Sequence, residues 1–398
     1  MKLPVTVADW KATRYQKKLI KKVLKSGRLT YGPMTRELEE RFAKIHGRKY
    51  AIFVNSGTSA LKIALRHYKE KYGWKDGDEV IIPALTFVAT MNVVLMNNLK
   101  PVLVDIGNNL NINPFLIERA ITKKTRAIIP VHLLGQSAQM DKIMKIAKKH
   151  GLKVIEDSCE TMYVSFKGRP VGSRGDIACF STYLAHLMVT GVGGFITTNN
   201  RKDAIAMRSI AFHGRDESYL NIDDNKKAGK AFDEMVKKRF YFNRFGYSDR
   251  NTELEAALGL GELRNYKKNL KKRQANAFYL EDNLDHVGFP LRYTEHAFML
   301  FPIIHDNRDR LVEYLEKKGI HTRHIMPLTN QPVVQRYFKG IDLAKRYRVA
   351  DWFNRYGLLI GCHQYLTKEQ LDYIVDTIGE FGMKFGEVPR YRIFSWRY

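Results

Sequence analysis

Three short stretches of the sequence hold residue types that can bind an anion, fix a ring nitrogen or move a proton. The first is Asn55-Ser56-Gly57-Thr58, between a predicted strand and a predicted helix. A glycine there lets the backbone approach an anion, and the N–H groups at a helix start favour a phosphate. A serine or threonine that only caps the helix gives the same pattern, so this stretch alone does not decide between the two.

The second stretch is Val154-Ile155-Glu156-Asp157, an apolar run that ends in two carboxylates. In an open α/β sheet, ligands bind beyond the carboxyl ends of the strands. An aspartate at such a place can hold the protonated ring nitrogen of a cofactor. A helix cap or an ion pair would use the same residue types.

The third stretch runs from Phe180 to Phe195. A strand is predicted to end near Ser181, and His186 follows before a glycine-rich turn at 191–194. Imidazole moves protons near neutral pH because its ordinary pKa is about 6.5. A lone histidine more often has a structural role, so its meaning depends on what surrounds it.

The elements that would position these residues alternate along the chain. Strands are expected at 51–54, 79–82, 102–105, 127–131, 153–157 and 195–198, and helices at 60–68 and 140–150. Regular alternation of strand and helix is typical of a mainly parallel sheet with helices on both faces. The sequence therefore predicts an α/β fold.

The pattern changes after about residue 255. We expect one long helical region at 253–284, a strand at 298–304, a helix at 307–318 and a final helix capped by Thr367 and Gln370. These elements are typical of a smaller α+β unit. The predicted parts are an arm or short helix (1–30), a large α/β domain (31–255) and a small C-terminal α+β domain (256–398).

Composition excludes several classes of protein. The chain has 398 residues, of which 44% are hydrophobic and 27% charged, as in an ordinary globular protein. No stretch approaches the about 18 apolar residues that span a bilayer, and the first ten residues lack the apolar segment of a secretory signal. Only three cysteines occur, without CxxC spacing, which argues against a disulfide framework or a metal site built on four cysteines. We expect a reduced, cytoplasmic protein without a metal site.

The charge is strongly positive, with 67 basic and 41 acidic residues and a formal net charge of +26. Such a surplus attracts anions, including nucleotides, phosphorylated substrates and nucleic acid. The basic residues form short clusters spread along the chain, which favours a solvated basic surface over a dedicated nucleic-acid face. We expect no membrane association.

In this order, the stretches resemble the DegT/StrS-type family of nucleotide-sugar aminotransferases and their dehydratase relatives, which are fold type I pyridoxal-phosphate enzymes. The resemblance covers nearly the whole chain. It implies a mainly parallel seven-stranded sheet in the large domain and a homodimer in which the partner subunit completes each site. The matching stretches are 32–33, 55–60, 77–83, 86–90, 130–136, 156–157, 191–194, 246–247 and 253–259.

The resemblance also implies how pyridoxal or pyridoxamine 5'-phosphate would be held. The stretch with Ser56, Gly57 and Thr58 would bind the cofactor phosphate together with Ser181. Phe87 would stack on the pyridine ring. Asp157 would pair with the ring nitrogen and keep it protonated, so that the ring can accept electrons.

Three positions depart from the family's aminotransferases. His186 stands where they have the lysine that forms a Schiff base with the cofactor, and residues 175–200 contain no lysine. Glu160 stands where glutamine is common. Ser248 stands where an asparagine often reaches the partner's phosphate, and Asn243, close by in sequence, is a second candidate for that contact.

Histidine in place of lysine is the hallmark of the family's 3-dehydratases, which use pyridoxamine phosphate to remove a sugar hydroxyl, and Glu160 is compatible with that group. One dehydratase branch carries an iron–sulfur cluster on four cysteines, so three cysteines favour the cluster-free branch, similar to GDP-4-keto-6-deoxymannose 3-dehydratase. We therefore expect C3 dehydration of a nucleotide-linked 4-keto-6-deoxy sugar. His186, as acid and base, Asp157 and Glu160 are the expected catalytic residues, and L-glutamate would restore the cofactor amine.

Three alternatives stay open at this point. The first is a nucleotide-sugar aminotransferase whose lysine comes from elsewhere, such as Lys153 or Lys167. The second is a non-catalytic homologue that binds the cofactor or a sugar nucleotide. The third, prompted by the charge, is an enzyme that acts on a nucleic-acid-linked substrate.

Overall fold

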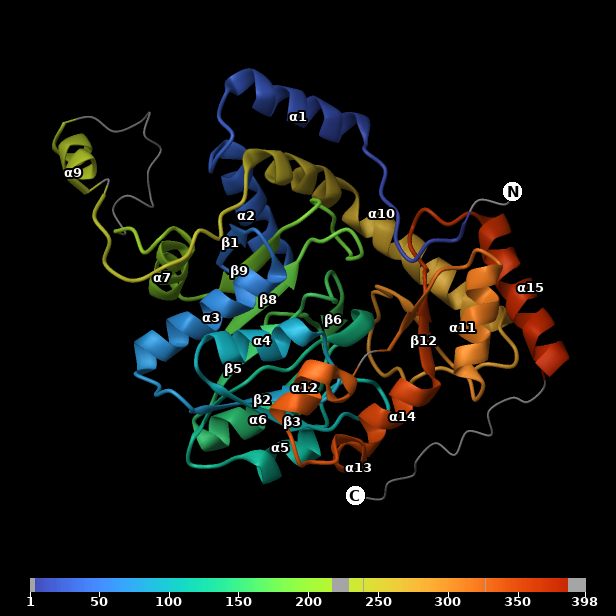
Figure 1. Ribbon diagram of the computed structural model, residues 1–398. Helices are drawn as coiled ribbons and strands as arrows, with labels where there is room; N and C mark the ends of the chain where they lie inside the picture. Colours follow the sequence, from blue (N-terminus) through green and yellow to red (C-terminus); the bar gives the residue numbers. More distant parts are fainter. Residues whose placement is uncertain (1–3, 217–228, 239, 326, 386–398) are drawn as a thin grey trace.

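A seven-stranded sheet forms the centre of the computed structural model, which describes residues 4–216, 229–238, 240–325 and 327–385 (Figure 1). The strand order is β1-β9-β8-β5-β4-β2-β3; β9 runs antiparallel to both neighbours, and the other pairs are parallel. This confirms the predicted α/β fold. The strands are β1 (Tyr50–Val54), β2 (Glu79–Pro83), β3 (Lys100–Val104), β4 (Thr125–Ile128), β5 (Lys153–Asp157), β8 (Ile177–Ser181) and β9 (Gly194–Thr198).

Helices connect these strands and cover both faces of the sheet. Crossovers between parallel strands are right-handed, so connections that lead in opposite directions across the sheet place their helices on opposite faces. By this rule α3 and α4 lie on one face of the sheet, and α5 and α6 lie on the other. On the first face α3 packs against both α4 and α7, and on the second face α5 packs against α6. The helices of this part are α2 (Pro33–Ile45), α3 (Gly57–Tyr72), α4 (Val88–Met96), α5 (Pro114–Ala120), α6 (Met140–His150), α7 (Arg201–Ala211) and α9 (Lys230–Lys238).

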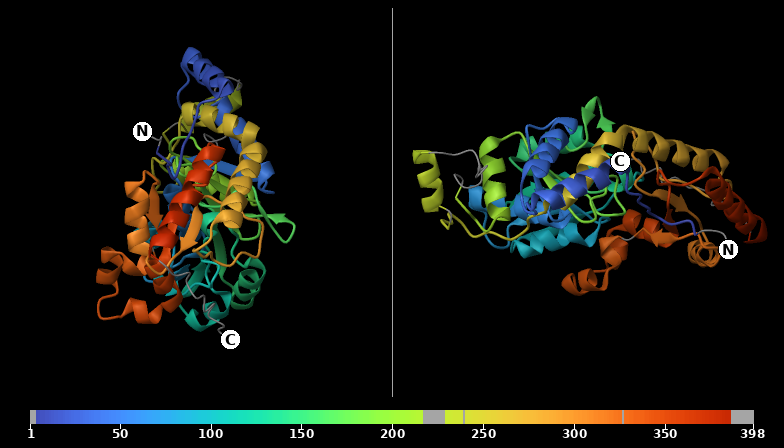
Figure 2. Two further views of the ribbon diagram at one scale, coloured as in Figure 1. Left: turned by 90° about the vertical axis from the view of Figure 1, so that its right-hand side faces the viewer. Right: turned by 90° about the horizontal axis from the view of Figure 1, so that it is seen from above.

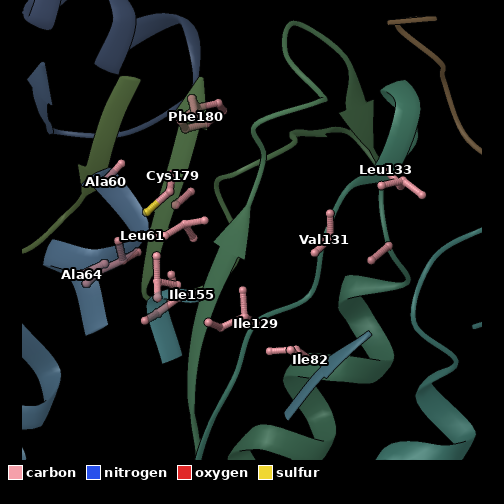
Figure 3. Close-up of a cluster of buried hydrophobic side chains, with 14 of the residues drawn as sticks. Ala60, Leu61, Ala64, Ile82, Ile129, Val131, Leu133, Ile155, Cys179 and Phe180 are labelled. Atoms are coloured by element: carbon pink, nitrogen blue, oxygen red, sulfur yellow. The ribbon is translucent and has the colours of Figure 1, made fainter. Parts of the chain in front are cut away.

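The main hydrophobic core lies between the sheet and these helices. Figure 3 shows Ala60, Leu61 and Ala64 of α3 beside Ile155 of β5 and Cys179 of β8. These residues are at most 1% exposed. Two alanines on one face of α3 bring the helix close to the strands, which fixes where its first turn lies relative to the ends of β5 and β8.

A smaller unit surrounds a second core at the C-terminal side. Its antiparallel sheet has the order β10-β12-β11, with α11 and α15 packed beside it. The elements around this core are β10 (Phe301–Ile304), α11 (Arg308–Lys317), β11 (Thr322–His324), β12 (Gly357–Ile360) and α15 (Lys368–Phe385). Helices α12 (Pro332–Tyr337), α13 (Leu343–Arg346) and α14 (Arg348–Tyr356) lie between β11 and β12 in sequence, but their buried residues belong to the main core. Residues 1–3 of the predicted arm and 386–398 of the predicted small domain lie outside the described residues.

The strand expected at 298–304 is only half as long in the structure. Phe298 has a positive φ of 50°, which a strand does not allow. The flanking residues use their N–H groups elsewhere: Ala297 donates to the Gly135 carbonyl and Met299 to the Leu134 carbonyl. This stretch therefore joins the two units instead of extending the small sheet.

Helix α10 (Glu253–Asn283) spans both units (Figure 2). Its first half packs against α1 (Arg14–Ser26) and α2, whereas Ala277 and Leu280 near its end belong to the second core. The predicted domain boundary at residue 255 falls inside this helix, and the division into domains remains a prediction. Figure 2 also shows the N-terminal arm returning to the small unit, where the N–H of Val5 donates to the Gly319 carbonyl over 2.8 Å.

Glu253 ties α10 to the start of α2. Gly32 is the N-cap of α2 and offers no side chain to the first N–H groups of that helix. The Glu253 carboxylate accepts the N–H groups of Gly32, Met34 and Thr35 over 2.9–3.0 Å, and it also accepts the Thr35 hydroxyl. A buried carboxylate from a distant segment thus does what a capping side chain usually does. Within the part of the chain that the structure describes, no helix is long and apolar enough to cross a membrane.

Candidate active site

The three chemically suggestive stretches come together at one edge of the large sheet. β1, β5 and β8 are parallel to one another, so Val54, Asp157 and Ser181 end their strands on the same side. A Cβ atom added at Gly57 would lie 2.7 Å from the Cys159 sulfur and 2.8 Å from the Ser181 Cβ atom. Only glycine therefore fits between the ends of β5 and β8.

The first turn of α3 provides an anion cradle at this edge. Ser56 is the N-cap, and its hydroxyl accepts the Ser59 N–H over 3.1 Å, so the hydroxyl itself serves the helix as an ordinary cap. Gly57 and Thr58 are the first two helical residues, and their N–H groups have no carbonyl in a preceding turn. Two N–H groups at a helix N-terminus beside the Ser181 hydroxyl suit a phosphate.

Asp157 is buried at the end of β5, with donors on both of its oxygens. Thr90 Oγ1 donates to Oδ2 over 2.9 Å, and the Cys159 N–H donates to Oδ1 over 3.2 Å. Burial raises the pKa of Asp157, and these hydrogen bonds oppose the rise. Among the described residues no lysine, arginine or histidine forms an ion pair with it. A buried carboxylate without a cation suits a protonated ring nitrogen.

The preceding residue, Glu156, faces the other side of the sheet, as neighbours in a strand must. His132 Nε2 lies 2.9 Å from its carboxylate, and Arg48, also buried, lies 3.4 Å away. The N–H groups of Arg174 and Gly175 donate to the same carboxylate over 2.8 and 2.5 Å. Glu156 is thus fully occupied as a structural carboxylate.

Glu160 and Phe87 line a cavity of about 110 Å³ beside Asp157. The Leu134 N–H donates to Glu160 Oε2 over 2.9 Å, but burial and the nearby Asp157 charge raise the pKa of Glu160 to about 7. Phe87 is the N-cap of α4, and 59% of its surface is exposed, so its ring is free to stack on a ligand. The other lining residues are Leu85, Thr86, Val88, Leu133, Leu134, His324, Ile325, Gln331 and Leu359.

His186 lies in the loop between Ser181 and β9. The His186 N–H donates to the Tyr183 carbonyl over 2.9 Å, whereas the ring atom Nδ1 is buried without a hydrogen-bond partner. Burial, with a smaller contribution from the Arg273 charge, lowers the pKa of His186 to about 4. The sequence suggested a pKa near neutrality; in the folded chain the ring is instead a neutral base at pH 7.

Comparison with known proteins decides the family. The family model described as "DegT/DnrJ/EryC1/StrS aminotransferase family" matches residues 11–379. The chain belongs to this family. Its members depend on pyridoxal phosphate and act on sugar nucleotides, and they include both aminotransferases and a 3-dehydratase.

Relatives of both kinds support this assignment. The spore coat polysaccharide biosynthesis protein SpsC of Bacillus subtilis is 37% identical over 382 residues, which cover 90% of this chain and 92% of SpsC. Helicobacter pylori PseC, an aminotransferase involved in the biosynthesis of pseudoaminic acid, superposes with a TM-score of 0.85 at 25% identity and covers 96% of this chain and 100% of its own. E. coli GDP-4-keto-6-deoxy-D-mannose-3-dehydratase with bound hydrated PLP superposes with a TM-score of 0.81 at 28% identity, covering 95% and 100%.

The residues at the sheet edge fit the family's cofactor. The cradle that a Cβ atom at Gly57 would fill, the first turn of α3 and Ser181 suit its phosphate. Asp157, buried without a cationic partner, suits its ring nitrogen, and Phe87 offers an exposed ring. The described residues hold no group of three or more histidine, cysteine, aspartate or glutamate side chains that could bind a metal, and all three cysteines are free.

Asn243 and Ser248 lie in the segment between α9 and α10, where each side chain has a hydrogen-bond partner within the chain. Asn243 follows α9, which projects beside α7 away from the sheet (Figure 1), and its amide donates to Asp216 over 2.7 Å. Ser248 is exposed and accepts a hydrogen bond from Arg250 over 3.2 Å. Their contact with a partner subunit's phosphate remains a prediction.

Sequence reasoning missed the donors that hold Asp157. Thr90 lies in the stretch that matches the family, but nothing in its spacing shows that it reaches across to β5. In the sequence, Cys159 is only one of three cysteines without CxxC spacing. Both become site residues only when the fold brings α4 and β5 together.

Proposed function

We propose that the protein removes the C3 hydroxyl of a nucleotide-linked 4-keto-6-deoxy sugar, with pyridoxamine 5'-phosphate as cofactor. The observation that carries this proposal is His186, which follows Ser181 where the family's aminotransferases have a lysine. Imidazole cannot form an imine with the cofactor aldehyde, but it can take and return a proton. The similarity to a solved 3-dehydratase over 95% of the chain supports the same assignment.

The two lysines considered as substitutes lie elsewhere in the fold. Lys153 begins β5, at the opposite end of the strand from Asp157, and its Nζ lies 4.8 Å from the centre of the Tyr72 ring. Lys167 is exposed, and its Nζ pairs with Asp141 over 2.6 Å. Their locations favour the dehydratase over an aminotransferase with a displaced lysine.

The first task of the protein is to hold the cofactor, which when bound supplies an amine for the sugar ketone and a ring that delocalises electrons. The N–H groups of Gly57 and Thr58 and the Ser181 hydroxyl would hold the phosphate. Asp157 would keep the proton on the ring nitrogen. Phe87, whose ring is exposed, would stack on the pyridine ring.

His186 moves the protons. Its ring is neutral at pH 7 because its pKa is about 4, so it is ready to accept a proton. The imidazolium that results is a strong acid in the same buried setting, and it gives its proton to the hydroxyl that leaves C3. One side chain thus acts first as base and then as acid.

Glu160 is the titratable group that the cavity shares with the exposed Phe87 ring. With a pKa of about 7, a large fraction of this carboxyl is protonated at neutral pH. In that form it donates a hydrogen bond, as the glutamine common in the family's aminotransferases does. Glu160 therefore orients the sugar or the cofactor without adding a negative charge.

The overall reaction balances with glutamate as the reductant. C3 of the sugar loses its oxygen and is reduced, while glutamate is oxidised to 2-oxoglutarate and releases its nitrogen as ammonia. The positive charge of the chain agrees with an anionic nucleotide-sugar substrate. We also propose that the protein forms a homodimer in which the partner subunit completes each site.

The test is to incubate the protein with pyridoxamine phosphate, glutamate and GDP-4-keto-6-deoxy-D-mannose, and to follow the sugar by NMR and ammonia by a coupled assay. We expect a 3-deoxy sugar and ammonia, and borohydride reduction of the holoenzyme should leave no cofactor on lysine. His186→Lys should form a reducible lysine adduct and lose at least a hundredfold in dehydration, whereas His150→Asn, a change at a surface histidine, should keep full activity.

Two results would overturn the proposal. A wild-type protein that traps the cofactor on a lysine and releases a 4-amino sugar is an aminotransferase. A His186→Lys variant that dehydrates as fast as the wild type would show that the histidine does not move the protons.

A further inference from the structure

A chain of two threonine hydroxyls leads to the buried carboxylate of Asp157. Thr86 Oγ1 lies 2.8 Å from Thr90 Oγ1, and Thr90 Oγ1 lies 2.9 Å from Asp157 Oδ2. The three residues are 3%, 1% and 4% exposed, so water does not compete for these contacts. Thr90 is 67 residues from Asp157 in sequence and belongs to another element.

The direction of these hydrogen bonds follows from counting protons. A hydroxyl has one proton to donate and two lone pairs to accept with. Thr90 donates its proton to the carboxylate, so the contact between the two hydroxyls must use the proton of Thr86. The order is therefore Thr86 to Thr90 to Asp157, and each donated bond polarises the next.

The same helical turn also carries Phe87. Phe87 is the N-cap of α4, and its carbonyl accepts the Thr90 N–H over 3.1 Å. The aromatic ring at the cavity and the hydroxyl on the carboxylate are thus held by one turn of backbone. Cys159 binds the other carboxylate oxygen through its N–H. Asp157 is fixed from two sides and has lone pairs left for one more donor.

We propose that Thr90, oriented by Thr86, is a positioning residue that holds the Asp157 carboxylate in its charged form and aims it at the cofactor's ring nitrogen. This role concerns only how the cofactor is held and goes beyond the proposed sugar reaction. A failure of the proposed dehydration would therefore leave this proposal unaffected, and the reverse also holds. Burial raises the pKa of Asp157, and the side chain and N–H of Cys159, the Thr90 hydroxyl and the charge of His132 oppose that rise. Among these groups only Thr90 lies on the turn that carries Phe87.

The test measures the ring nitrogen directly. The enzyme is loaded with pyridoxamine phosphate labelled with ¹⁵N in the ring, and the ¹⁵N chemical shift at pH 7 reports how the proton is shared between the ring nitrogen and Asp157. Thr90→Val removes the hydroxyl and keeps the volume. Without this donor the carboxylate is a stronger base, so the proton moves from the ring nitrogen toward Asp157, and the ratio of the two forms changes by about tenfold.

Three further variants separate positioning from packing. Thr90→Ser keeps a hydroxyl and should restore the wild-type ¹⁵N shift. Thr86→Val leaves the Thr90 donor in place and should cause a smaller decrease in the protonated fraction of the ring nitrogen. Thr197→Val is the matched control, because Thr197 is equally buried but lies in β9, where its hydroxyl has only a 3.4 Å contact with the Ala178 carbonyl.

The proposal is overturned if Thr90→Val keeps the wild-type ¹⁵N shift, or if Thr90→Ser changes it as far as Thr90→Val. If Thr90→Val does not fold or does not bind the cofactor, the Thr86→Val shift decides: a smaller protonated fraction of the ring nitrogen supports the proposal and an unchanged fraction overturns it. A decrease of the same size in Thr197→Val would show that any threonine-to-valine change in the core has this effect, which also overturns it.

Discussion

Replacing Glu160 by glutamine should remove a large pH dependence from the stability of the cofactor-free protein. Burial raises the pKa of Glu160 from its ordinary 4.5 to about 7, and its hydrogen bond from the Leu134 N–H does not offset this. Glutamine keeps the shape and can still accept that N–H through its carbonyl oxygen. The change therefore removes only the titration.

The sign and size follow from proton binding in the two states. Between pH 4.5 and about 7 the folded protein keeps a proton on Glu160 that the unfolded chain has already released, so the free energy of unfolding falls as the pH rises. Each pH unit corresponds to about 1.4 kcal/mol, so the wild type loses about 3 kcal/mol across this window and nothing further above it. In Glu160→Gln the free energy of unfolding does not change across this window, because glutamine does not titrate.

The assay is reversible urea unfolding of both proteins at half-unit steps from pH 4.5 to 8. The variant should gain about 3 kcal/mol relative to the wild type by pH 7 and hold that gain at pH 8. Glu313→Gln is the control, because this exposed glutamate pairs with Lys317, which lowers its pKa and gives the opposite sign. A relative gain below about 1 kcal/mol would show that Glu160 stays solvated and would refute the reasoning.

Two other predictions concern the cradle and the α2 cap. Gly57→Ala should weaken pyridoxamine phosphate binding at least tenfold in a spectroscopic titration, because the new methyl group would lie 2.7 Å from the Cys159 sulfur; an unchanged Kd would contradict the packing argument. Glu253→Ala should lower the free energy of unfolding by about 3 kcal/mol or more, because three buried N–H groups lose their acceptor. Glu255→Ala, which removes only the capping box of α10, should cost about 1 kcal/mol, and an equal loss in both variants would contradict the role of Glu253.

Local patterns predicted the elements well where apolar runs are short and clearly bounded. The helix at 140–150 and the strand at 153–157 have the predicted bounds, because Gly151, with a positive φ of 65°, ends the helix two residues before the strand begins. The pattern misled at 298–304, where an apolar run crosses from one unit to the other. Its apolar residues are buried as expected, but the backbone of Phe298 turns to meet the large domain.

From the sequence, only those site residues that follow the ends of predicted strands could be placed together. The rule that ligands bind at the carboxyl edge of a parallel sheet correctly brings Gly57, Asp157 and Ser181 together. The hydroxyl of Thr90 and the neutral state of His186 depend on contacts and burial created by packing. Residue spacing predicts neither the Thr90 contact nor the burial of the His186 ring, so both become visible only in the folded chain.

The continuity of α10 limits how the two units can move. At about 1.5 Å per residue, its 31 residues form a rod about 45 Å long that is anchored in both cores. The N-terminal arm makes a second crossing, because α1 packs on the first half of α10 while Val5 is buried in the far core. A hinge opening would have to bend this rod and pull out the arm together. The two units are therefore joined as one stiff frame, in which the long helix and the arm act as two parallel ties.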